Sequence, residues 1–89
     1  MSTKIKICGL TRREDVLHAA ACGADLLGFV FAESPRRVEP KQVLRICRGL
    51  PEKVKKVGVF VDAPLHQIKE TALTCKLDLL QLHGSEDAA

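Results

Sequence analysis

Leu26–Phe31 reads LLGFVF and Val57–Val61 reads VGVFV, and these two short apolar runs decide the fold of this sequence. Runs of this length that are almost wholly apolar are typical of parallel strands covered on both faces. Lys4–Cys8, which is bounded by Gly9, reads as an earlier strand. Leu79–His83 (LLQLH) reads as a later one. The sequence therefore predicts four parallel strands.

Each gap between these strands carries a helical pattern. Thr11 and Glu14 fit a capping box at the start of a first helix, which is expected to end at Gly23. After the polar loop 32–39, Pro40 suits the first turn of a second helix, and Pro64 opens a third. The apolar stripes expected to face the sheet are Val43, Ile46, Cys47 and Leu50 in the second helix and Leu65, Ile68, Ala72 and Cys75 in the third.

The strand ends recur about every 25 residues, a spacing that indicates right-handed βαβ units and a parallel sheet. Four such units are half of an eight-stranded (β/α)₈ barrel, which typically needs about 250 residues. The predicted fold class is therefore α/β, with the first four strands and three helices of a TIM barrel. We expect residues 1–89 to form a single partial domain, the N-terminal half of such a barrel.

Composition and charge exclude several classes of protein. The chain of 89 residues is 46% hydrophobic and 28% charged, with a net charge of +3, which is typical of a globular protein and favours anionic ligands slightly. A nucleic-acid partner is not expected, because a continuous basic face and aromatic stacking platforms are both lacking. No apolar run is long enough for a membrane span or a signal peptide, so we expect a cytoplasmic protein with reduced thiols. The four cysteines contain no C-x-x-C pair, so a zinc site is not expected.

Four motifs, in order and in register, carry a resemblance to a known family. They are Lys6–Thr11 (KICGLT), Gly23–Asp25 followed by GFVF and SPR, Val57–Val61 (VGVFV), and Leu80–Gly84 (LQLHG). The chain resembles the N-terminal part of phosphoribosylanthranilate isomerases, barrel enzymes of tryptophan biosynthesis. The resemblance implies an Amadori rearrangement of N-(5-phosphoribosyl)anthranilate to 1-(2-carboxyphenylamino)-1-deoxyribulose 5-phosphate. It implies a small phosphorylated substrate and neither a cofactor nor a metal.

The resemblance assigns the general base to Cys8. A free thiol is only a few per cent ionised at neutral pH, so this role needs a local influence that favours the thiolate. We expect Lys6 on the opposite side of the strand, where it would not supply that influence. By residue type alone a small buried hydrophobe is the commoner role for a cysteine. Cys47 and Cys75, on apolar stripes, and Cys22, near a helix end, are interpreted as packing residues.

The resemblance also implies substrate-binding residues. Arg36 matches the arginine that binds the substrate carboxylate, for which the planar guanidinium is well suited. The loop is one residue shorter than the family pattern and Arg37 stands where an aromatic is common, so Arg37 is the alternative ligand. Gln81 and His83 share one side of their strand and are placed near the substrate.

Two other functions remain open at this point. In the first, the chain is a catalytically inactive half-barrel that self-associates through its exposed sheet edges. In the second, the chain is a small flavodoxin-like binder of a phosphorylated ligand, which would need a phosphate loop after the first strand. Gly9–Thr11 is the segment available for that loop.

Overall fold

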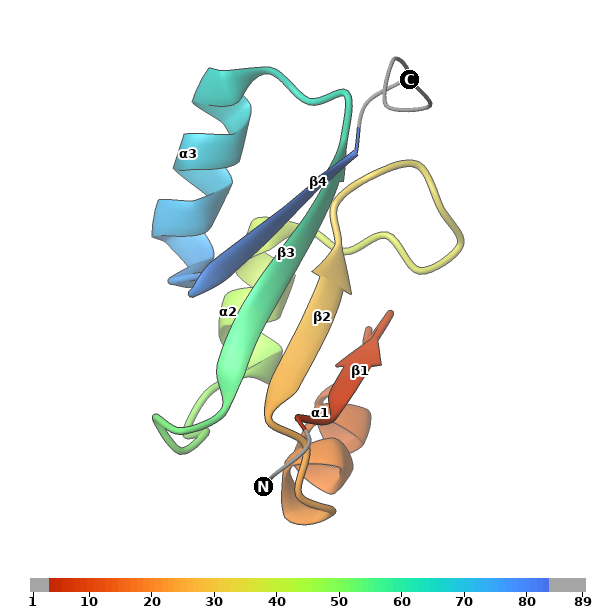
Figure 1. The fold of residues 1–89 in the computed structure, drawn as a ribbon, viewed down its shortest axis with the longest axis vertical. Helices are drawn as coiled ribbons and strands as arrows, with labels where there is room; N and C mark the ends of the chain where they lie inside the picture. Colours follow the sequence, from red (N-terminus) through yellow and green to blue (C-terminus); the bar gives the residue numbers. More distant parts are fainter. Residues whose placement is uncertain (1–3, 84–89) are drawn as a thin grey trace.

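The computed structural model describes residues 4–83 and contains four strands and three helices (Figure 1). Their bounds are β1 Lys6–Cys8, α1 Arg13–Ala21, β2 Leu26–Val30, α2 Pro40–Ile46, β3 Lys55–Val61, α3 Leu65–Cys75 and β4 Leu79–His83. All neighbouring strands pair in parallel, in the order β1-β2-β3-β4. The predicted α/β alternation is confirmed. Within residues 4–83 no helix is long and apolar enough to cross a membrane.

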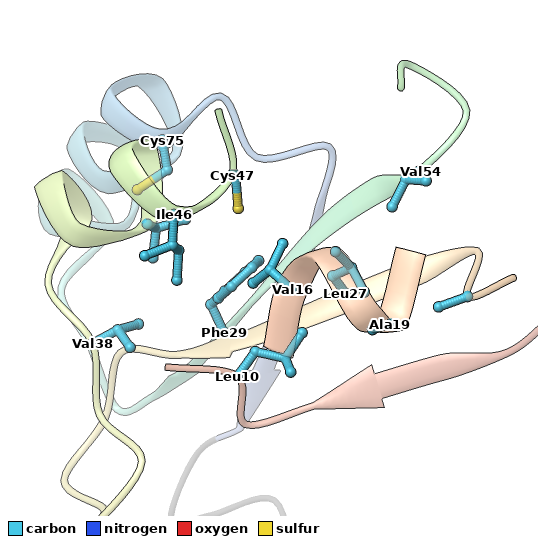
Figure 2. Close-up of a cluster of buried hydrophobic side chains, with 12 residues drawn as sticks. Leu10, Val16, Ala19, Leu27, Phe29, Val38, Ile46, Cys47, Val54 and Cys75 are labelled. Carbon is cyan, nitrogen blue, oxygen red and sulfur yellow. The ribbon is translucent and has the colours of Figure 1, made fainter. Parts of the chain in front are cut away.

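The sheet is wound in one direction, with its helices packed on one face. Phe29 and Leu27 of β2 are fully buried against Val16 of α1 and Ile46 of α2, in a cluster shown in Figure 2. A flavodoxin-like fold places β1 inside the sheet and covers both faces with helices. The observed order, with β1 at an edge, is instead that of one half of a (β/α)₈ barrel, and it excludes the flavodoxin-like alternative.

Polar contacts connect the helices at their ends. The Gln42 side chain of α2 donates to the carbonyl of Thr11 at 2.9 Å, and the Arg13 guanidinium of α1 donates to the carbonyl of Ile46 at 3.3 Å. The Cys75 thiol of α3 donates to the carbonyl of Pro40 at 3.3 Å. The Ile46 carbonyl is one of the last four of α2, which have no intrahelical partner. The three bonds connect neighbouring helices near their ends.

The predicted capping box of the first helix is wrong. The N-cap of α1 is Arg12, with extended backbone and no side-chain cap bond, so Thr11 lies one residue too early to cap the helix. The Thr11 carbonyl instead accepts a hydrogen bond from the Gln42 side chain. Pro40 does begin α2, as predicted, where the N–H of Glu39 donates to the Gln42 side chain at 3.3 Å.

Some of the predicted packing positions are also wrong. Leu65 is 66% exposed, because α3 buries the row Ile68, Thr71 and Cys75 instead. Leu50 does pack against the core as expected, but it lies beyond the end of α2, which stops at Ile46. Cys22 is exposed rather than packed, because it follows the last residue of α1.

Candidate active site

The sheet face opposite the helices, called here the open face, carries the candidate residues. Leu27 and Phe29 point into the helical layer, so the intervening Gly28 faces the other way. Cys8 pairs with Gly28 in the parallel register and therefore shares this face. Val30, two residues after Gly28, also lies on this face of β2, and it pairs with Val59 of β3. Val59 pairs in turn with Gln81 of β4, so Gln81 lies on the same face.

Gly28 makes room for the Cys8 thiol. A Cβ built at position 28 would overlap Cys8 Sγ and would lie 3.2 Å from Cys8 Cα. The absence of a side chain thus lets the sulfur lie flat against the neighbouring strand. Cys8 is nevertheless exposed, so its thiol is accessible to a small molecule over the open face.

Arg36 packs on Gly9, the residue that follows Cys8. A Cβ built at Gly9, whose φ is +81°, would lie 2.7 Å from Arg36 Cδ and 3.0 Å from Arg36 Nη1. The next residue, Arg37, is directed elsewhere: its guanidinium approaches the carboxylates of Glu33 and Glu39 at 3.9 Å each. Of the two arginines, Arg36 alone thus packs on the residue that follows Cys8.

A hydrogen-bonded chain crosses the open face from β1 to β4. The Lys6 ammonium donates to Gln81 Oε1, and Gln81 Nε2 lies 3.0 Å from His83 Nε2. In a flat sheet β1 and β4 would be about 14 Å apart, at about 4.8 Å per strand, and their side chains would point in parallel directions. The contact therefore requires a sheet that curls toward this face, as in a barrel whose strands are staggered.

The expectation that Lys6 lies on the opposite side of β1 from Cys8 is wrong. Residues two apart in a strand share a face, and the Lys6 side chain reaches across the same open face toward Gln81. Lys6 is the residue that the sequence interpretation missed. The alternation that placed Gln81 beside His83 could have found it.

The other cysteines differ from Cys8. Cys47 and Cys75 are buried, and burial raises the pKa of each thiol to about 11, so both stay neutral at physiological pH. Their interpretation as packing residues is confirmed. The exposed Cys22 Sγ lies 3.6 Å from His18 Nε2, at the end of α1.

The candidate residues lie at the carboxyl ends of their strands, where barrel enzymes place their chemistry. Cys8 ends β1 and His83 ends β4, while the backbone N–H of Asp62 donates to the His83 carbonyl at 2.8 Å. The open face offers a thiol, an ammonium, an amide and an imidazole, and the Arg36 guanidinium lies beside Gly9 just beyond the end of β1. Among residues 4–83 no three His, Cys, Asp or Glu side chains gather closely enough to hold a metal.

The family profile for N-(5'phosphoribosyl)anthranilate (PRA) isomerase matches residues 5–89. The chain belongs to the phosphoribosylanthranilate isomerase family. Over 88 residues, which are 98% of this chain, it is 57% identical to the N-(5'-phosphoribosyl)anthranilate isomerase of Geobacter sp. strain M21. It is 51% identical over 85 residues to the corresponding protein of Streptococcus mutans.

Solved isomerase structures share this fold. The phosphoribosylanthranilate isomerase of Thermotoga maritima superposes with a TM-score of 0.90 at 41% identity, over 94% of this chain and 42% of that one. Another structure of such an isomerase, in complex with reduced 1-(o-carboxyphenylamino)-1-deoxyribulose 5-phosphate, gives the same TM-score over 44% of its chain. The chain spans about 43% of the length of the Geobacter relative. The half-barrel fold expected from the sequence is confirmed.

Proposed function

We propose that this chain carries the base and the carboxylate-binding part of a phosphoribosylanthranilate isomerase active site. The reaction is the Amadori rearrangement of N-(5-phosphoribosyl)anthranilate to 1-(2-carboxyphenylamino)-1-deoxyribulose 5-phosphate. The observation that supports this best is that the Cys8 thiol packs on Gly28 while Arg36 packs on Gly9, the residue that follows Cys8. The proposed substrate is a small phosphorylated molecule, as expected for the family to which the chain belongs.

Cys8 is the proposed general base. Opening of the furanose ring leaves a C1 iminium, and the thiolate removes the proton from C2. The C2–H electron pair then forms a C1–C2 double bond, and the C1–N pair moves to nitrogen. The resulting enolamine tautomerises to the ketose. General-base catalysis typically contributes about 10²–10⁴ in rate, which is the share proposed for Cys8.

Arg36 is the proposed ligand of the anthranilate carboxylate, through a bidentate charge-assisted pair. Its stem rests on Gly9, the residue that follows Cys8, and the proposal is that the guanidinium and the Cys8 thiol act on the same substrate. Gln81 and His83 are proposed to contact the sugar portion from β4. Among residues 4–83 we assign neither the general acid that opens the ring nor the phosphate site. A cytoplasmic location and the treatment of residues 1–89 as one partial domain stay predictions from the sequence.

A completed isomerase tests this proposal. Residues 1–89 are joined to the part of the Geobacter relative that lies beyond the matched region, and turnover is followed by the fluorescence of the anthranilate group. We expect the fusion to act within about tenfold of the Geobacter protein, a difference of about 1.4 kcal/mol in the barrier. The 89-residue chain alone should show no turnover. An inactive but folded fusion would refute the proposal.

We also propose that the 89-residue chain self-associates when it is made alone. Within the described residues β1 and β4 are edge strands, and β4 exposes Leu79, Leu80 and Leu82 by 49%, 46% and 58%. An exposed edge with apolar side chains is a template for pairing with another chain. Sedimentation equilibrium should show a dimer or larger species.

Paired substitutions on β4 give the control. The double variant Leu80→Lys, Leu82→Lys should sediment as a monomer, because it places charge on the apolar side of the edge strand. Leu73→Lys, at a leucine of α3 that is 80% exposed, should leave the association unchanged. A wild-type monomer at all concentrations, or an equal effect of Leu73→Lys, would contradict self-association through β4.

A further inference from the structure

Lys6 has a place in the hydrogen-bonded chain across the open face that the proposed function does not use. We propose that Lys6 is a positioning residue that acts through Gln81 to fix the tautomer of His83, with the proton on Nδ1. This inference rests on the proposed function for its consequence in catalysis. The hydrogen bonds that support it do not depend on any substrate.

The direction of each bond follows from the donors and acceptors available. An ammonium only donates, so the Gln81 atom that faces Lys6 must be the carbonyl oxygen Oε1. The amide nitrogen of Gln81 then faces His83, and an amide nitrogen only donates. His83 Nε2 must therefore accept, and a neutral imidazole whose Nε2 accepts carries its proton on Nδ1.

The consequence is a defined hydrogen-bonding role for His83. Without Lys6 the Gln81 amide group could rotate so that its oxygen and nitrogen exchange places. The oxygen would then accept from an Nε2–H of His83 equally well. With Lys6 in place, the neutral imidazole of His83 can donate only through Nδ1. Because Lys6 comes from β1 and His83 from β4, the tautomer also depends on the curl of the sheet.

Nitrogen NMR of the imidazoles tests the tautomer directly. The chain has three histidines, and substitution of His83→Gln assigns the signal of interest. In the wild type the His83 ring should show a protonated Nδ1 and an unprotonated Nε2. Lys6→Met should give a mixture of tautomers, whereas Lys6→Arg should preserve the wild-type pattern, because arginine also only donates.

A second variant predicts the opposite signature and guards against a Lys6 variant that fails to fold. Gln81→Glu removes the amide donor, and the new carboxylate accepts from both neighbours. The His83 proton should then move to Nε2. Lys4→Met, at an exposed lysine next to β1, should leave the ring pattern unchanged. An unchanged His83 pattern in both Lys6→Met and Gln81→Glu would overturn the inference.

Kinetics of the completed isomerase connect the tautomer to function. Lys6→Met should lower kcat/KM by about 10–100-fold, comparable to the loss of outer partners of functional histidines elsewhere. Lys6→Arg should recover most of this loss, and Lys4→Met should lose nothing. An inactive wild-type fusion would count against the proposed function but not against the inferred tautomer, since the NMR pattern does not require turnover. A tautomer that changes while kcat/KM stays constant overturns the positioning role.

Discussion

Substitution of Gly28→Ala tests the geometry on which the candidate active site depends. The added methyl group would overlap Cys8 Sγ and would also lie 3.2 Å from Cys8 Cα and 3.4 Å from Cys8 Cβ. The backbone of position 28 is ordinary strand, so alanine adds no conformational strain there. The effect of the substitution is therefore steric, and it is directed at the thiol.

The expected loss of stability follows from this overlap. Overpacking of a well-packed site typically costs about 1–3 kcal/mol. Alanine offsets about 0.5–1 kcal/mol of that cost, because it has less freedom than glycine in the unfolded chain. We expect a net loss of about 0.5–2 kcal/mol, and each kcal/mol lowers Tm by about 2–4 °C in a protein of 150–250 residues. Calorimetry of the completed isomerase measures it.

A double-mutant cycle isolates the contact. In a Cys8→Ala background the sulfur is gone, so Gly28→Ala should cost about 1 kcal/mol less than in the wild type. The single variant should also lose at least about tenfold in kcat/KM, because small misplacements of a catalytic group cost up to about 10²-fold. Gly23→Ala is the control. Its φ is +95° and no atom lies within 4 Å of the built Cβ, so it should cost stability but leave kcat/KM unchanged.

The result that would refute this reasoning is additivity. If Gly28→Ala destabilises equally with and without the Cys8 sulfur, the thiol does not lie against Gly28. The placement of Cys8 on the open face would then be wrong.

Three further predictions concern the cysteines and the arginines of the completed isomerase. Cys8→Ser should lower kcat by about 10²-fold or more at little cost in stability. Cys47→Ser should instead lower the free energy of unfolding in urea by about 1–3 kcal/mol and leave turnover intact. If the two variants exchanged these effects, the assignment of the base would be contradicted. Arg36→Ala should reduce kcat/KM by the equivalent of about 2–3 kcal/mol for a lost charge-assisted pair, and Arg37→Ala by much less; equal losses would mean that both arginines bind the carboxylate. Because burial raises the pKa of Cys47 and Cys75 from 9.0 to about 11, the stability that their neutral thiols contribute should be complete below about pH 9 and lost as the pH rises to about 11. Urea midpoints across this range should fall less in a variant without both thiols, and an identical fall would contradict the prediction.

Much of the fold could be predicted because it depends on local patterns. The apolar runs that became β2 and β3 need cover on both faces, which few folds provide. Pro40 marked the start of α2, because a proline at the first helical position loses no intrahelical bond. The half-barrel followed from the repeat of these units.

The errors depend on tertiary contacts that a local pattern does not contain. Whether α3 buries Leu65 or Thr71 depends on how the helix is rotated about its axis against its neighbours. The rotations that would bury the two residues differ little, so the sequence pattern does not decide between them. Thr11 has the right chemistry for a cap, but its carbonyl is used by Gln42 of another helix. The side of β1 on which Lys6 lies follows from strand alternation and could have been predicted, but its contact with Gln81 also requires the curl of the sheet, a property of all four strands together.

The central claim is that Cys8 and Arg36 act on one substrate at the open face. The most direct test is a crystal structure of the completed isomerase with reduced 1-(o-carboxyphenylamino)-1-deoxyribulose 5-phosphate, the ligand present in one of the related isomerase structures. We expect Cys8 Sγ within hydrogen-bond reach of C2 and a bidentate pair between Arg36 and the carboxylate. A ligand held by Arg37, or bound with C2 turned away from Cys8, would contradict the claim.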